Sequence, residues 1–141
     1  MLMTNSFEIA NLISRMPSAH ILCVGDLMLD RFVTGIVDRV SPEAPIPVLE
    51  VKDEAVMIGG AGNVVRNLVA FGATAELVAV IVEDAEGAEL SALLNEILGA
   101  TAHLVASAGR RTTIKTRFMT GSQQLWRADY EAQGALDDGI R

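Results

Sequence analysis

The sequence has few of the residues that crosslink a protein, anchor it in a membrane or make it strongly basic. Its single cysteine, Cys23, excludes a disulfide within the chain and a cysteine-based zinc site. No apolar run approaches the length of a membrane span, and the N-terminal residues show no signal-peptide pattern. Lys and Arg number 11 against 18 Asp and Glu, which disfavours a surface for nucleic acid or anionic membranes. These absences favour a soluble cytoplasmic protein.

Half of the 141 residues are hydrophobic, which is enough for the core of one domain. Short apolar runs predict strands at residues 20–24, 76–82 and 102–105, and we expect the first, which contains Cys23, to be fully buried. Helical spacing of apolar residues predicts helices from Ser6 to just before Pro17, over 64–71 and over 88–98. This alternation of strands and helices predicts an α/β fold with a parallel sheet.

Two further pairs of segments have the residue pattern of half-exposed β-strands. Residues 33–37 and 48–52 are strand-like and flank a proline-rich segment, so they predict a small antiparallel flap. Residues 112–119 and 123–129 alternate around Gly121, which predicts a hairpin that pairs with this flap.

The stretch Gly59-Gly60-Ala61-Gly62-Asn63 lies between an apolar segment and a predicted helix. Glycines allow the backbone to approach a ligand closely, and free N–H groups at a helix start favour polar or anionic ligands. The amide of Asn63 suits hydroxyl groups. A tight connection without any ligand is the alternative interpretation.

Several charged residues are candidates for binding, each with a structural alternative. Asp30 follows the first strand and suits sugar hydroxyls, whereas Asp26 is more simply a turn residue. Lys115 and Arg117 share one face of the predicted hairpin and suit an anionic group; the alternative is two solvated charges. The acidic residues at 83–86 are typical of a helix N-terminus; the more specific alternative is that they bind a metal ion.

Three motifs together resemble the ribokinase-like (PfkB) carbohydrate kinases. They are Gly25-Asp26-x-Met28-Leu29-Asp30-Arg31, Ser41-Pro42-Glu43-Ala44-Pro45-x-Pro47-Val48 and Gly59-Gly60-Ala61-Gly62-Asn63. Within that family the chain is most similar to the kinases of D-glycero-β-D-manno-heptose 7-phosphate, the kinase half of bifunctional heptose kinase and adenylyltransferase proteins. The resemblance covers residues 21–130 and includes residues 113–117 and 123–129.

The resemblance implies a three-layer α/β/α fold with a mostly parallel central sheet and a small antiparallel β lid. We expect the lid at residues 31–58 and 111–130, within a single kinase-domain segment at 1–141. In such kinases the lid often serves as a dimer contact, which implies a homodimer. We expect neither nucleic acid nor a membrane as a binding partner.

The resemblance also implies a sugar site and a reaction. The residues that match the family's sugar-binding positions are Asp30, Gly59, Gly60 and Asn63, and we expect Lys115 and Arg117 to contact the substrate phosphate. The implied reaction transfers a phosphoryl group from ATP, with Mg²⁺, to the anomeric hydroxyl of heptose 7-phosphate. Its product feeds the synthesis of ADP-heptose for the lipopolysaccharide core.

One family feature has no match in this sequence. The family's Gly-Ala-Gly-Asp segment, which carries the general-base aspartate, is absent, and so are the ATP-binding strands. We therefore expect an N-terminal half of the domain that holds the sugar site, has no catalytic residue, and binds neither ATP nor Mg²⁺. Such a half would leave a sheet edge and apolar faces uncovered.

Other functions also fit parts of the pattern. Another PfkB-type carbohydrate kinase and a catalytically inactive sugar-binding or dimerisation module both stay open. A Rossmann dinucleotide binder is disfavoured, because residues 59–62 lack the G-x-G-x-x-G spacing.

Overall fold

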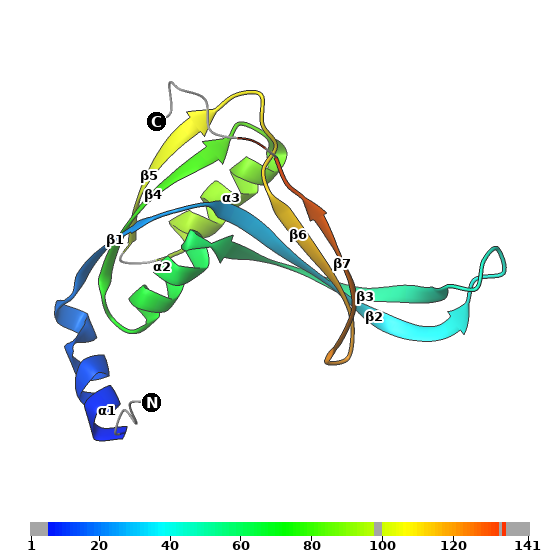
Figure 1. Cartoon of the computed structure of the whole chain (residues 1–141), viewed down its shortest axis with the longest axis horizontal. Coiled ribbons are helices and arrows are strands. Elements are labelled where there is room, and N and C mark those ends of the chain that lie inside the picture. The colour runs from blue at the N-terminus through cyan, green and yellow to red at the C-terminus, as the bar shows by residue number, and fades with distance from the viewer. Residues whose placement is uncertain (1–5, 98–99, 133, 135–141) are drawn as a thin grey trace.

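The computed structural model describes residues 6–97, 100–132 and 134, which form two β-sheets and three α-helices (Figure 1). Sheet A contains β1 (His20–Val24), β4 (Thr74–Val82) and β5 (Ala100–Ser107) in the order β1-β4-β5, with parallel pairing throughout. The parallel sheet predicted from the alternation of strands and helices is confirmed.

Sheet B is mixed and follows the order β3-β2-β6-β7. Its strands are β2 (Leu27–Val40), β3 (Pro47–Gly60), β6 (Ile114–Thr120) and β7 (Gln123–Tyr130). The β2/β3 and β6/β7 pairs are antiparallel, and β2 joins them by parallel pairing with β6. The predicted flap and hairpin therefore do pair, although the flap strands are longer than predicted and β2 already contains Asp30.

The outer ends of β2 and β3 extend past the rest of sheet B as a two-stranded arm (Figure 1). The last β2 residue paired with β6 is Gly35, so beyond it β2 pairs only with β3; residues 36–51 are called the arm below. The arm exposes apolar side chains, with Ile36 51%, Val40 64% and Val51 47% accessible. An isolated two-stranded ribbon of this kind is marginally stable.

The helices lie where the apolar spacing predicts them. They are α1 (Ser6–Arg15), α2 (Ala61–Ala70) and α3 (Ala85–Asn95), and a short 3₁₀ turn (Met16–Ser18) follows α1. Helix α3 begins before residue 88 because Asp84 caps it, and it ends at Asn95, earlier than the predicted end at residue 98. No helix among the described ranges is long and apolar enough to cross a membrane.

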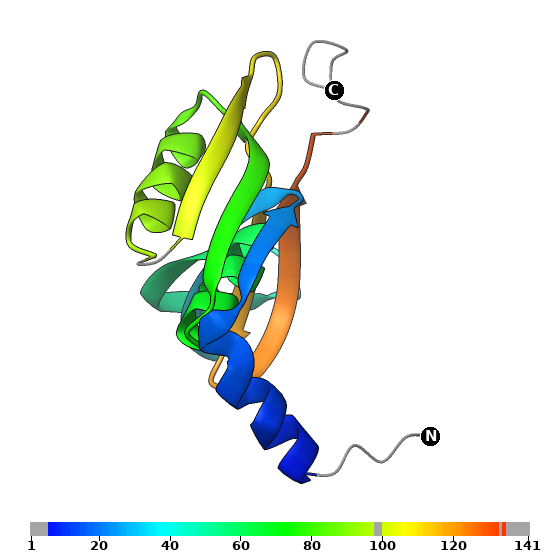
Figure 2. The ribbon, with the colours of Figure 1, turned by 90° about the vertical axis from the view of Figure 1, so that its left-hand side faces the viewer.

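The core lies between sheet B, the helices and one face of sheet A. Figure 2 shows α3 on one side of sheet A. Both sheets and the helices α2 and α3 contribute to this core. Its buried members are Leu27, Leu29, Ile58, Val65, Ala75, Leu77, Ala79, Leu90 and Leu94. Asp30 lies next to Leu29, which is 0% exposed, so the core fixes the strand on which Asp30 sits.

The prediction that residues 20–24 form a fully buried strand is wrong. Strand β1 is an edge strand of sheet A, and Leu22 and Val24 are 62% and 72% exposed. Cys23 on the opposite face is only half-buried against the core. The reason is that the described helices cover a single face of this sheet. The expected uncovered edge and apolar face are thus confirmed among the described residues.

Candidate functional site

The predicted site residues of sheet B come together through strand register. Asp30 of β2 pairs with Met57 of β3 and with Lys115 of β6, and Met28 pairs with Gly59. Alternate residues share a face, so the charged side chains gather on the side of sheet B away from the core. We call this the polar face; it comprises Asp30, Lys115, Arg117, Arg127 and Asp129.

Asp30 is held by an ion pair. Its Oδ1 accepts a hydrogen bond from Nη1 of Arg117 at 2.5 Å, and the two side chains are 22% and 23% exposed. The Arg117 guanidinium also lies over the Phe32 ring, 5.3 Å from its centroid. These contacts fix the orientation of the Asp30 carboxylate.

Gly59 lies directly against the other oxygen of that carboxylate. A Cβ atom at position 59 would lie 2.6 Å from Oδ2 of Asp30 and 2.8 Å from Cγ of Met28. Any side chain there would displace Asp30 or Met28. Glycine is therefore required for the present position of the carboxylate.

Gly60 makes the turn into α2. Its φ of +59° lies in the left-handed region, and a Cβ would lie 2.3 Å from the Asp26 carbonyl oxygen. That oxygen accepts a hydrogen bond from Ala61 N at 2.9 Å. Asp26 thus serves the turn through its backbone, as the structural alternative predicts.

Asn63 stands apart from this group. Its Oδ1 accepts a 2.8 Å hydrogen bond from Nη2 of Arg66, and its carbonyl oxygen accepts one from Nδ2 of Asn67 at 2.9 Å. Within the part of the chain that the structure describes, no hydrogen bond joins Asn63 to Asp30. Its amide is engaged by the next turn of its own helix.

The two cations of β6 both have carboxylate partners. Lys115 pairs with Glu131 and, at 3.5 Å, with Asp129, which also accepts a 2.8 Å contact from Nε of Arg127. Hydrogen bonding to Glu131 raises the pKa of Lys115 above its usual value despite the opposing effect of burial. An anion binding to Lys115 or Arg117 would have to share or displace these carboxylates.

Asp84 makes a connection that sequence reasoning missed. Its Oδ1 accepts from Gly87 N (2.7 Å) and from the Thr112 hydroxyl (2.6 Å), and its Oδ2 accepts from Thr112 N (2.9 Å). Burial alone would raise the pKa of Asp84, but the hydrogen bonds from Thr112 and Gly87 together lower it. The Asp-x-x-Gly spacing predicts the helix cap; nothing local predicts Thr112. No metal-binding cluster of acidic, histidine or cysteine side chains exists among the described residues.

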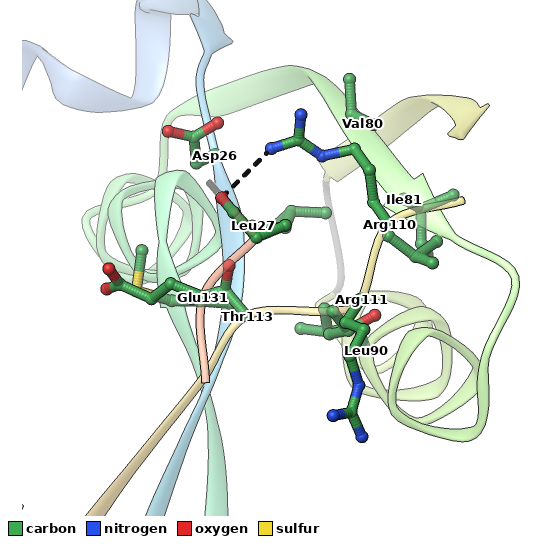
Figure 3. A pocket seen from close by; sticks show the side chains of 13 residues that line it. Asp26, Leu27, Val80, Ile81, Leu90, Arg110, Arg111, Thr113 and Glu131 are labelled. Atoms are coloured by element: carbon green, nitrogen blue, oxygen red, sulfur yellow. Dashed lines mark hydrogen bonds between the residues drawn. The ribbon is translucent and has the colours of Figure 1, made fainter. Parts of the chain in front are cut away.

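A cavity of about 240 Å³ lies where the end of β4 meets the starts of β2 and β6 (Figure 3). Its charged lining residues are Asp26, Arg110, Arg111 and Glu131. The two arginines extend in different directions, and Nη2 of Arg110 donates to the Ala132 carbonyl at 3.5 Å. No local sequence pattern predicts this cavity, because its lining comes from separate segments.

Known proteins are similar to this chain in sequence and in fold. No family model matches it. It is 51% identical to the bifunctional protein HldE of Rhodospirillum rubrum over 92% of the chain and 26% of that protein. It is 48% identical to the HldE of Paramagnetospirillum magneticum over 99% of the chain and 28% of that protein. The chain therefore spans about a quarter of the length of these relatives.

Solved structures share the fold at lower identity. A putative ribokinase from Agrobacterium tumefaciens matches with a TM-score of 0.61 at 18% identity, over 81% of this chain and 36% of that one. A fructokinase with bound ATP from Xylella fastidiosa matches with a TM-score of 0.58 at 18% identity, over 79% of this chain and 33% of that one. The chain is thus homologous to the HldE proteins over about a quarter of their length and shares the fold of these solved sugar-kinase structures.

Proposed function

We propose that the polar face of sheet B and the glycine turn bind the sugar of an ATP-dependent carbohydrate kinase, with heptose 7-phosphate as the substrate. The observation that carries this proposal is the Asp30 carboxylate, fixed by Arg117 on one side and bordered by Gly59 on the other. A fixed carboxylate beside bare backbone suits a hydroxyl-rich ligand. The HldE relatives favour a heptose among such ligands.

In this proposal each site residue has a separate role. Asp30 accepts hydrogen bonds from sugar hydroxyls, and Gly59 and Gly60 allow the sugar to approach the backbone. Asn63 reaches the same sugar after exchanging its contact with Arg66.

Lys115 and Arg117 offset the negative charge of the substrate phosphate. Each of them then shares its present carboxylate partner with the ligand. Charge-assisted hydrogen bonds of this kind are stronger than those between neutral groups.

The proposed reaction uses Mg·ATP, which supplies the phosphoryl group for the anomeric hydroxyl, as a step toward ADP-heptose and the lipopolysaccharide core. The described residues fit the sugar half of this reaction and not a metal site, since no cluster of metal ligands occurs among them. We propose no catalytic residue on this chain and expect it to hold neither ATP nor Mg²⁺. Because this reaction would consume ATP and a sugar phosphate, we propose a cytoplasmic location for it.

We also propose a homodimer through the β lid, in which the arms of two copies cover each other. The exposed apolar side chains of residues 36–51 support this, because two arms would together form a sheet with more than two strands. The same observation favours the alternative function, an inactive dimerisation or sugar-binding module. Sedimentation with and without heptose 7-phosphate separates the two, since a dimer indifferent to sugar favours the module.

Calorimetric titration of the chain with heptose 7-phosphate tests the sugar site. We expect weak binding, from which Asp30→Ala and Asn63→Ala each remove about 1–3 kcal/mol, the usual cost of an unpaired buried polar group. Equal affinity in the wild type and both variants would refute the site. Incubation with heptose 7-phosphate and Mg·ATP should yield no bisphosphate at a useful rate, and clear turnover would refute the assignment of no catalytic residue.

A further inference from the structure

Asp84 lies in the turn between β4 and α3, at the junction of the two sheets. It receives one hydrogen bond from its own helix, from Gly87 N, and two from Thr112, which is 28 residues away. Thr112 is 5% exposed, and it lies just before β6 begins. A helix cap needs only the first of these bonds. The other two bonds join the turn after β4 of sheet A to the segment just before β6 of sheet B.

Hydrogen bonds between sequence neighbours of Thr112 and of Asp30 connect Asp84 to Asp30. Thr113, next to Thr112, accepts a 2.9 Å hydrogen bond from Leu29 N through its carbonyl oxygen. Leu29 pairs with Ile114, the first residue of β6, and precedes Asp30. The position of Thr112 therefore sets where β6 begins along β2.

The register of β6 against β2 has no turn to fix it. In a hairpin the turn sets the register, but β2 and β6 are parallel strands far apart in sequence. A slip of one residue would move every β6 side chain to the opposite face, and Arg117 would no longer lie on the face of Asp30. A side-chain contact at the start of β6 can supply the missing constraint.

We propose that Asp84 is a positioning residue for the sugar site, holding β6 in the register that places Lys115 and Arg117 beside Asp30. The consequence for ligand binding rests on the proposed function, whereas the consequence for the register does not. Asp84 itself is not part of the polar face.

The chemistry of the contact provides a selective variant. Asp84→Asn keeps one acceptor oxygen for Gly87 N and the Thr112 hydroxyl, but places an NH₂ group against Thr112 N, where two donors then face each other. The cap and the bond from the Thr112 hydroxyl survive, whereas the bond from Thr112 N is lost. Thr112→Val removes the hydroxyl bond from the other side, and Glu83→Gln makes the same carboxylate-to-amide change on the exposed neighbour as a control.

Amide hydrogen exchange of the chain tests the register, and calorimetry with heptose 7-phosphate tests its consequence. We expect Asp84→Asn and Thr112→Val to speed exchange at Ile114–Arg117 and to weaken binding about tenfold, within the range for a lost buried partner. Glu83→Gln should match the wild type. In an Arg117→Ala background, Asp84→Asn should weaken binding by a smaller factor than in the wild type, because part of its effect passes through Arg117.

The outcomes separate the possible roles. Wild-type exchange in β6 and wild-type affinity in both variants would overturn the proposal and leave Asp84 a helix cap. Faster β6 exchange in a chain that binds no heptose 7-phosphate, even as wild type, would support the register role and refute the proposed function. If Asp84→Asn does not fold, Thr112→Val decides by the same two readouts.

Discussion

Sheet A and sheet B differ in what their outer faces present. The outer face of sheet A carries the exposed apolar Leu22 and Val24 beside a single Glu76–His103 pair, whereas that of sheet B carries several charged side chains, most of them paired. Exposed apolar surface is stabilised only by packing against something else. Paired charges around a fixed carboxylate are already satisfied and can exchange partners with a polar ligand. The difference favours sheet A as a packing surface and sheet B as the proposed binding surface.

The largest expected effect comes from the same substitution placed on the two sheets. Leu29→Ala, at a side chain that is 0% exposed, should lower the free energy of unfolding by about 2–5 kcal/mol. Leu22→Ala, at 62% exposure, should change it by less than about 0.5 kcal/mol. Urea unfolding measures both. A similar loss at Leu22 would break the comparison, because it would mean that this face is covered in solution.

A smaller effect is expected where the glycine turn meets Asp30. Gly59→Ala should destabilise the fold by about 1–3 kcal/mol, the usual cost of overpacking, because its Cβ would lie 2.6 Å from the Asp30 carboxylate. Gly25→Ala, where the nearest atom is 3.2 Å away, is a milder control. Thermal unfolding of both variants checks this. A harmless Gly59→Ala would show that Asp30 is not held as described.

The pH dependence of stability sharpens the link between the sheets. Because hydrogen bonds lower the folded-state pKa of Asp84 below its ordinary 3.8, its stabilising effect is complete above 3.8 and is lost as the pH falls through the folded value. We expect unfolding free energy to fall more steeply below this pH in the wild type than in Asp84→Asn.

A high-salt series serves as the control for this titration. The Lys52 hydrogen bond also lowers the pKa of Glu50, but that pair is exposed, so salt should screen it and leave the Asp84 effect. Identical acid profiles for wild type and Asp84→Asn at high salt would contradict the assignment.

The smallest effect is expected for association through the arm. Val40→Ser, at a residue 64% exposed, should weaken the proposed dimer about tenfold, or about 1.4 kcal/mol, without changing the unfolding of the chain. Val24→Ser, at a similarly exposed residue of sheet A, should leave the dimer unchanged. Analytical ultracentrifugation distinguishes them. The reverse result would assign the dimer contact to the open face of sheet A.

Local patterns predicted much of this structure. The glycine turn into α2, the hairpin around Gly121 and the shared face of Lys115 and Arg117 all follow from residue spacing, which the backbone obeys directly. The family motifs led to the fold that the comparisons confirm.

Non-local features were not predictable. The apolar composition of β1 suggests burial, but burial depends on whether another layer covers its face, and the described helices cover only the opposite one. The Asp84–Thr112 and Asp30–Arg117 contacts join residues far apart in sequence, so no local pattern indicates them. The roles of Asp30, Gly59, Gly60, Asn63, Lys115 and Arg117 stay predictions.

Chemical-shift mapping of the ¹⁵N-labelled chain during titration with heptose 7-phosphate tests the central claim most directly. We expect shifts at Asp30, Gly59, Gly60 and Arg117 on sheet B, and none at Leu22 or Val24 on sheet A. Shifts confined to sheet A, or a spectrum unchanged at saturating ligand, would contradict the assignment of sheet B as the binding surface.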